Sequence, residues 1–210
     1  MPVPLIFESI RVRGLVQGVG FRPTVWRLAR DCGLSGDVRN DGAGVLIRLQ
    51  GQAESIEDFV ARLAHECPPL ARIDALERSV CGETFEPVPG FRILASDGGE
   101  VHTGIVADAA TCAACREEIL DPANRRFRYP FTNCTHCGPR LSIVNRIPYD
   151  RANTSMAAFP MCPACEREYS NPADRRFHAQ PNACAACGPR VWLVDALGVS
   201  VPIDPAGDAI

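Results

Sequence analysis

Lysine is absent from this sequence of 210 residues, so all 22 of its strongly basic side chains belong to arginine. The absence excludes a Walker phosphate-binding loop and any lysine that forms a Schiff base with a carbonyl substrate. The chain also lacks an apolar run as long as a membrane span, and its first residues lack the basic and apolar regions of a signal peptide. We therefore expect a cytoplasmic protein with no membrane partner.

Cysteine, in contrast, is abundant: the chain has 11 cysteines, and eight of them form four C-x-x-C pairs. Paired cysteines in a chain without an export signal indicate metal binding in a reducing compartment. The spacing C-x2-C-x18-C-x2-C occurs twice, and each copy offers four soft thiolates to one tetrahedral zinc ion. The predicted ligand sets are Cys112, Cys115, Cys134 and Cys137, and Cys162, Cys165, Cys184 and Cys187. We expect two structural zinc ions; redox-active or merely buried cysteines are the alternative.

The two cysteine sets belong to an internal repeat with an offset of fifty residues. Aligning residues 112–140 with residues 162–190 gives 14 identities in 29 positions, so both copies are expected to bind alike. Arg125-Arg126 and Arg175-Arg176 stand at equivalent positions, where they could neutralise the metal sites. His136 and His178 are expected outside these sites, because the thiolates already fill the coordination positions.

The charge balance gives no reason to expect a nucleic-acid partner. The whole chain carries a formal charge of −3 at pH 7. Residues 112–190 contain 11 arginines and seven acidic residues, a formal excess of +4. Two zinc sites of four thiolates each, with a charge of about −2 per site, would cancel that excess.

Residues 1–95 have the pattern of a small α+β domain. Helices are expected from Pro23 to Gly33, and from a cap at Ser55 to the Pro68-Pro69 pair. Alternating apolar residues and turn signals predict short strands at 6–12, 37–39, 45–49, 73–80 and 91–94. Up to residue 80 the order of these elements is βαββαβ, that of a ferredoxin-like sandwich, and the strand candidate at 91–94 follows it.

The rest of the chain shows little periodicity. Residues 96–111 are predicted to be a linker, and residues 112–194 a small irregular zinc-ribbon module with fingers at 112–137 and 162–187. The tail, residues 195–210, looks like the truncated start of a following domain or linker.

A glycine-rich turn joins the first predicted strand to the first predicted helix. Such a turn presents free backbone N–H groups and the positive end of a helix dipole to an anion. Arg22 opens the helix and can add a bidentate hydrogen bond to a phosphate. The candidate phosphate-binding residues are therefore Val16, Gln17, Gly18, Val19, Gly20 and Arg22. A merely tight turn is the alternative.

The residues of this turn also carry a family resemblance. Val16-Gln17-Gly18-Val19-Gly20-Phe21-Arg22, followed by Gly36-Asp37-Val38-Arg39-Asn40 and Asp41-Gly42, resembles the acylphosphatase signature. The resemblance implies the βαββαβ fold, a phosphate held by the loop amides and Arg22, and an attacking water oriented by Asn40. An acyl phosphate is already activated, so positioning and charge neutralisation would supply most of the catalysis.

The pairing of this domain with tandem four-cysteine motifs resembles the HypF family of hydrogenase-maturation carbamoyltransferases. Three further segments resemble that family: Cys134-Thr-His-Cys137-Gly-Pro-Arg140, Pro148-Tyr-Asp-Arg151 and Asp174-Arg-Arg-Phe-His178. The resemblance implies carbamoyl phosphate as substrate. It also implies ATP-dependent transfer of the carboxamide to the C-terminal cysteine of a HypE-type partner, for cyanide-ligand synthesis in [NiFe]-hydrogenases.

In that family, ATP is used by domains that would lie beyond these 210 residues. Two rival functions stay open on the sequence. One is a stand-alone acylphosphatase of broad specificity, and the other is a zinc-ribbon interaction module whose first domain is silent.

Overall fold

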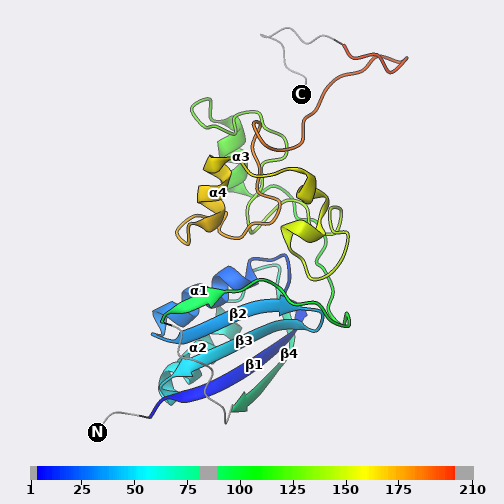
Figure 1. Cartoon of the computed structure of the whole chain (residues 1–210). Coiled ribbons are helices and arrows are strands. Elements are labelled where there is room, and N and C mark those ends of the chain that lie inside the picture. Colours follow the sequence, from blue (N-terminus) through cyan, green and yellow to red (C-terminus); the bar gives the residue numbers. More distant parts are fainter. Residues whose placement is uncertain (1–3, 81–88, 202–210) are drawn as a thin grey trace.

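The computed structural model describes residues 4–80 and 89–201. An α/β sandwich forms the first half of the chain, and an irregular Cys-rich module (residues 112–194) lies beside one end of it (Figure 1). In chain order the elements are β1 (Ile6–Leu15), α1 (Phe21–Asp31), β2 (Ser35–Asp41), β3 (Gly44–Gly51), α2 (Ala53–His65), β4 (Arg72–Val80), β5 (Phe91–Ile93), α3 (Ala113–Leu120), the 3-10 helices η1 (Arg151–Asn153) and η2 (Ser155–Ala158), and α4 (Pro163–Ser170). The expected βαββαβ order is confirmed up to β4, and β5 lies within the further strand expected at 91–94.

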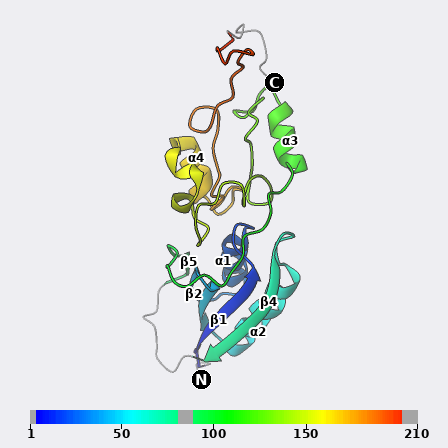
Figure 2. The same cartoon turned by 90° about the vertical axis from the view of Figure 1, so that its right-hand side faces the viewer.

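The five strands form one sheet in the order β4-β1-β3-β2-β5. Neighbouring strands are antiparallel except β2 and β5, which are parallel. Ile10 lies opposite Ile47 and Val12 opposite Val45, and all four side chains are fully buried. Both helices cover the same face of the sheet (Figures 1 and 2). The core of the sandwich therefore lies between the inward-facing strand residues and the apolar stripes of α1 and α2.

Helix α2 begins earlier than the sequence signal indicated. Ser55 was expected to cap it, but the helix begins at Ala53, with Gln52 in an extended conformation at its N-cap and no side-chain cap. Ser55 thus lies inside the first turn, and the prediction of a cap there is wrong. The apolar face of α2 is as expected, because Ile56 and Phe59 are buried. Periodicity located this face, whereas a serine inside the first turn looks the same in sequence as one at the cap.

The segment expected to be a linker, residues 96–111, is packed along the sandwich and is not a free tether (Figure 2). Its backbone donates hydrogen bonds from Asp97 to the Asn40 carbonyl at 3.0 Å and from His102 to the Gly42 carbonyl at 2.7 Å. Val106 belongs to the buried core. The segment therefore connects the two halves of the chain while it covers one end of the sheet.

The Cys-rich module has little regular structure. Helices α3 and α4 begin directly after Cys112 and Cys162, which stand at their N-caps in nearly identical conformations. The repeat in the sequence is therefore a repeat in local structure. Within the described ranges, no helix is both long and apolar enough to cross a bilayer.

Candidate functional site

The eight cysteines expected to bind metal lie in two clusters, one in each repeat. The Cys134 Sγ lies 3.8 Å from both the Cys112 Sγ and the Cys137 Sγ, and the Cys137 Sγ lies 3.5 Å from the Cys115 Sγ. The equivalent distances in the second cluster are 3.8, 3.8 and 3.6 Å. Four sulfurs placed about 2.3 Å from one tetrahedral zinc ion would be about 3.8 Å apart. Both clusters therefore have the size of a four-thiolate metal site.

Each cluster is built from one copy of the repeat and not from halves of both. The sulfurs are too far apart for disulfides, and the described cysteines are all free. His136 is exposed, His178 lies elsewhere, and neither belongs to a described metal-binding group. The expected grouping of the thiolates thus matches the geometry.

The first copy supplies the arginines that surround the second cluster. Arg125 and Arg126 donate hydrogen bonds to the Cys165 Sγ at 3.2 and 3.7 Å. Both also pair with Glu168, and Arg126 is only 2% exposed. Burial opposes ionisation of Glu168, but the hydrogen bonds from Arg126 and Arg125 lower its pKa to about 2. Glu168 is thus a fixed anion that holds both arginines beside the thiolates.

The second copy supplies the arginines beside the first cluster in the same arrangement. Arg175 donates to the Cys115 Sγ at 3.1 Å and pairs with Glu118 at 2.9 Å. Arg176, 3% exposed, donates to the same carboxylate. The arginines that the sequence placed near the metal sites therefore neutralise the cluster of the opposite copy. This exchange ties the two repeats together.

The glycine-rich turn runs from the end of β1 to the start of α1. Gly18 and Gly20 have φ values of 76° and 80°, in the left-handed region that favours glycine. The buried Gln17 side chain donates to the carbonyls of Asp41 and Gly44 at 2.8 and 2.9 Å. These bonds tie the turn to the end of β2 and the start of β3.

Arg22 and Asn40, predicted to share a site, line one small cavity together with Gly18 and Gly20. The volume of the cavity is ≈ 30 Å³, which has room for a water or two. Arg22 is the second residue of α1, and Asn40 lies near the end of β2 with 1% exposure. The Asn40 Oδ1 is buried and has no hydrogen-bond partner among the described residues. Such an atom is costly unless a water or ligand donates to it.

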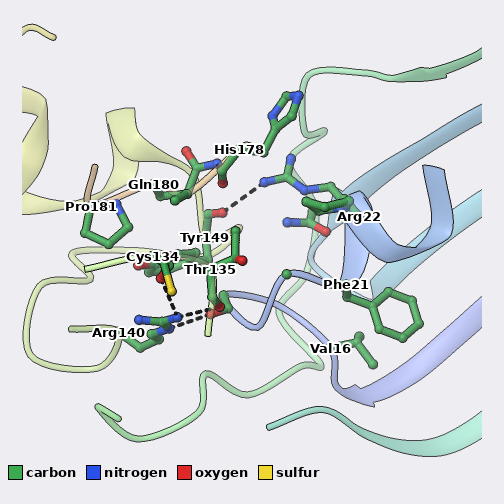
Figure 3. Close-up of a pocket in the computed structure, with 15 residues that line it drawn as sticks. Val16, Phe21, Arg22, Cys134, Thr135, Arg140, Tyr149, His178, Gln180 and Pro181 are labelled. Carbon is green, nitrogen blue, oxygen red and sulfur yellow. Dashed lines mark hydrogen bonds between the residues drawn. The ribbon is translucent and has the colours of Figure 1, made fainter. Parts of the chain in front are cut away.

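The Cys-rich module forms the opposite wall of this cavity. Figure 3 shows side chains of the module facing Arg22 and the turn. The cavity-lining residues from the module are Cys134, Thr135, Arg140, Tyr149, His178, Ala179, Gln180 and Pro181. On the sandwich side, Trp26 of α1 packs edge-on against Phe177, with ring centroids 5.4 Å apart. The cavity therefore lies at the junction of the two halves of the chain.

The guanidinium of Arg22 forms an ion pair with a carboxylate of the Cys-rich module. The Asp150 Oδ1 lies 2.7 Å from the Arg22 Nη2, and the side chain of Arg22 is only 8% exposed. Arg22 also donates to the Tyr149 carbonyl at 3.5 Å and to the Ser96 hydroxyl at 3.3 Å. The guanidinium is thus directed toward an anion, as expected for a phosphate ligand, and here that anion is a side chain.

His178 faces the same junction as a neutral imidazole at pH 7. Burial, and then the cation of Arg22, lower its pKa to about 4, against a smaller opposing effect of Asp150. Its ring packs on Tyr169 and Phe177, with centroids 5.0 and 4.6 Å away. The expected packing role of His178 is consistent with this position, and the ring adds no charge to the cavity.

Sequence reasoning did not predict this second wall. Asp150 and Gln180 lie more than a hundred residues beyond the turn, and no spacing pattern links them to Arg22. The only signal was that Pro148-Tyr-Asp-Arg151 and Asp174-Arg-Arg-Phe-His178 resemble family segments.

Comparison with known families divides the chain at the same place. The acylphosphatase family model matches residues 8–93, and the HypF finger model matches twice, at residues 111–144 and 161–194. The acylphosphatase of Mannheimia succiniciproducens is 45% identical over 76 residues, which are 36% of this chain and 83% of that protein.

Longer relatives span both halves. The carbamoyltransferase HypF2 of Cupriavidus necator is 54% identical over 153 residues, 72% of this chain and 19% of the relative. The carbamoyltransferase HypF of Rhodobacter capsulatus is 56% identical over 154 residues, 72% of this chain and 20% of the relative. The chain thus spans about a fifth of the length of these relatives.

One experimental structure, of full-length HypF in a phosphate- and nucleotide-bound form, superimposes with a TM-score of 0.85 at 43% identity. It covers 93% of this chain, which corresponds to 26% of that structure. The structure of Thermococcus kodakarensis HypF gives a TM-score of 0.76 at 43% identity, over 87% of this chain and 23% of the other. The chain therefore belongs to the HypF family and contains an acylphosphatase domain and two HypF fingers.

Proposed function

We propose that the acylphosphatase domain hydrolyses carbamoyl phosphate at the cavity between Gly18, Arg22 and Asn40. One observation carries the proposal. The buried Asn40 Oδ1, which has no hydrogen-bond partner in the described part of the chain, lines the same cavity as a buried arginine and the N-terminus of α1. The arrangement combines an anion site with an acceptor that can hold a water, and these are the two requirements for hydrolysis of an acyl phosphate.

In the proposed reaction the substrate phosphate takes the place of the Asp150 carboxylate on Arg22. The loop amides and Arg22 neutralise the phosphate oxygens. Asn40 accepts a hydrogen bond from a water and holds it in line with the bond to the acyl oxygen. The water oxygen binds phosphorus, the bond from phosphorus to the acyl oxygen breaks, and the proton of the water passes to a phosphate oxygen. The products are carbamate and inorganic phosphate.

The eight cysteines would hold two zinc ions in structural sites, because four thiolates leave no coordination position for water or substrate. In a longer protein like its HypF relatives, carbamate formation would be the first step of an ATP-dependent transfer to the C-terminal cysteine of a HypE-type partner. The adenylating and transferase steps would belong to domains beyond the residues described. With two four-thiolate zinc sites the formal +4 of residues 112–190 would be cancelled, so the charge of the Cys-rich module does not favour a nucleic-acid partner.

The test separates phosphate binding from hydrolysis. Asn40→Ala should bind inorganic phosphate as the parent protein does, because the positive potential stays with Arg22 and the loop amides. Its phosphate release from carbamoyl phosphate should fall on the order of a hundredfold or more, since the water loses its position. Arg22→Ala should lose binding and hydrolysis together. Calorimetry with inorganic phosphate and a phosphate-release assay measure the two properties on each variant.

Matched controls are Asn145→Ala, at an exposed site outside the cavity, and Arg27→Ala, on the solvent side of the same helix. Neither should change binding or rate. A parallel loss of binding and hydrolysis in Asn40→Ala would make Asn40 a binding residue and refute the water-holding role. A parent protein that hydrolyses no acyl phosphate would favour the silent-domain rival, and equal rates with larger acyl phosphates would favour the broad-specificity rival.

A further inference from the structure

We propose that Arg140 is a positioning residue of the phosphate loop, and that the first cysteine cluster, not the second, controls the anion affinity of that loop. The inference rests on the proposed function, because the anion concerned is the phosphate of the substrate. It adds a role for one half of the duplicated module that the other half does not share.

Arg140 forms hydrogen bonds with both the phosphate loop and the first cysteine cluster. The side chain is 1% exposed. Its Nε donates to the Gly18 carbonyl at 2.6 Å, across 122 residues of sequence. Its two terminal nitrogens donate to the carbonyls of Cys134, Thr135 and Cys137, with the Thr135 bond at 2.7 Å. One guanidinium therefore holds the C-x-x-C turn of the first cluster and the glycine of the phosphate loop at the same time. Figure 3 shows Arg140 beside Cys134 and Thr135.

The bond to Gly18 orients a peptide group of the loop. In a trans peptide, the carbonyl of one residue and the N–H of the next point in opposite directions. Since Arg140 binds the Gly18 carbonyl, the Val19 N–H points away from Arg140. Loss of this bond would leave the peptide group free to rotate, and the glycines on either side of Val19, which line the cavity, would lose their fixed position.

The loop is also packed against the first cluster. A Cβ placed on Gly18 would lie 3.3 Å from the Arg140 Cγ and from ring carbons of Tyr149. A Cβ placed on Gly20 would lie 3.3 Å from the Thr135 Cβ. The glycines thus permit both the positive φ values and the close approach of the Cys-rich module.

The internal repeat provides an unusually close control. Arg190 stands at the position equivalent to Arg140, fifty residues later, and it is exposed. Cys187 is likewise equivalent to Cys137. The two clusters have the same ligands and nearly the same sulfur distances. When matched variants keep equal metal content, a difference in phosphate binding therefore reports contact with the phosphate loop and not the chemistry of the metal site.

The experiment compares Arg140→Gln with Arg190→Gln in the metal-loaded protein. Calorimetry with inorganic phosphate should give a dissociation constant raised about tenfold in Arg140→Gln, as for the loss of one charge-assisted hydrogen bond. The KM for carbamoyl phosphate should rise with it. Arg190→Gln should stay within about twofold of the parent. Arg140→Lys, which keeps a charged donor, should recover part of the affinity.

The metal content of each variant is measured in parallel, so that a loss of loop positioning can be told from a loss of the folded metal site. The proposal requires that Arg140→Gln loses phosphate affinity while it keeps the parent metal content. Unchanged affinity in that variant, or equal losses in both arginine variants, would overturn it. A phosphate affinity that only follows metal loss would overturn the positioning role of Arg140.

A second pair of variants tests the same proposal if Arg140→Gln does not fold. Cys137→Ser and Cys187→Ser should each lower the metal content by one ion, but only Cys137→Ser should weaken phosphate binding. Equal weakening by both would refute the assignment to the first cluster. If instead the parent protein binds no phosphate at all, it is the proposed function that fails.

Discussion

At the scale of single residues, His178 is the group whose protonation the fold opposes most clearly. Its pKa of about 4 lies below the ordinary value of 6.5 because burial and the Arg22 cation disfavour the charged ring. Between pH 6.5 and pH 4 the unfolded chain binds a proton at this residue and the folded chain does not. The free energy of unfolding therefore rises with pH in this window, and stability is lost as the pH falls from 6.5 to 4.

We expect His178→Gln to remove that contribution. Between pH 6.5 and 4.5 the parent protein should lose up to about 1.4 kcal/mol of stability per pH unit relative to the variant. Denaturant unfolding at several pH values measures the difference. His65→Gln, at an exposed site on α2, is the control and should follow the parent. Parallel pH curves for the parent and His178→Gln would show that the ring can be protonated in the folded state at little cost.

The residue scale is also where prediction from sequence was most uneven. Arg22 and Asn40 were named because a local motif carries them, and the structure places both at one cavity. Asp150 was not foreseen, since it meets Arg22 across 128 residues of sequence. A motif records contacts within a segment, whereas a contact between two domains depends on how their surfaces fit, which no periodicity encodes.

At the scale of elements, helices α3 and α4 each present one glutamate to the arginine pair of the other copy. Arg126 is nearly fully buried, so its charge depends on Glu168 for compensation. Removing one partner of a buried ion pair leaves the other charge uncompensated, which costs about 3–5 kcal/mol in known cases. The exchanged pairs therefore stabilise the contact between the two copies.

Glu168→Gln should accordingly lower the free energy of unfolding of the Cys-rich module by roughly 3 kcal/mol. The matched control is Glu166→Gln, on the same helix with an exposed side chain, which should change stability little. Thermal unfolding followed together with metal release measures the effect. Equal melting temperatures for the two variants would contradict a structural role for the exchanged pairs.

Elements were predicted well where periodicity is strong. The alternation of Ile10 and Val12 and the apolar stripe of α2 both located buried faces. The boundary of α2 failed, because the Gln52 conformation that begins the helix leaves no mark in the sequence. The repeat predicted two alike metal clusters, but equal spacing could not tell which copy's thiolates each arginine pair would meet.

At the scale of the whole molecule, the chain should carry two metal ions, which we expect to be zinc. Elemental analysis of protein purified under reducing conditions should find two zinc ions per chain, and Cys112→Ser should reduce this to one. Structural zinc contributes about 10–16 kcal/mol to folding in small domains, so a chelator should unfold the Cys-rich module. The sandwich has its own buried core and should keep its far-ultraviolet signal.

Fewer than two metal ions in the parent protein, or loss of the sandwich signal together with the metal, would contradict this division of stability. Several contacts across the junction are polar: Arg22 donates to the Tyr149 carbonyl, Arg140 donates to the Gly18 carbonyl, and the Tyr149 N–H donates to the Gln17 Oε1. The Trp26–Phe177 contact is aromatic.

The ion pair between Arg22 and Asp150 has a consequence for turnover in the proposed reaction. After hydrolysis, inorganic phosphate remains on Arg22, and a site that binds anions well releases them slowly. A carboxylate tethered next to the same guanidinium competes for it at a high effective concentration. Its return to Arg22 would displace the product phosphate, so the free energy spent in displacing Asp150 when substrate binds would be recovered as faster release of phosphate.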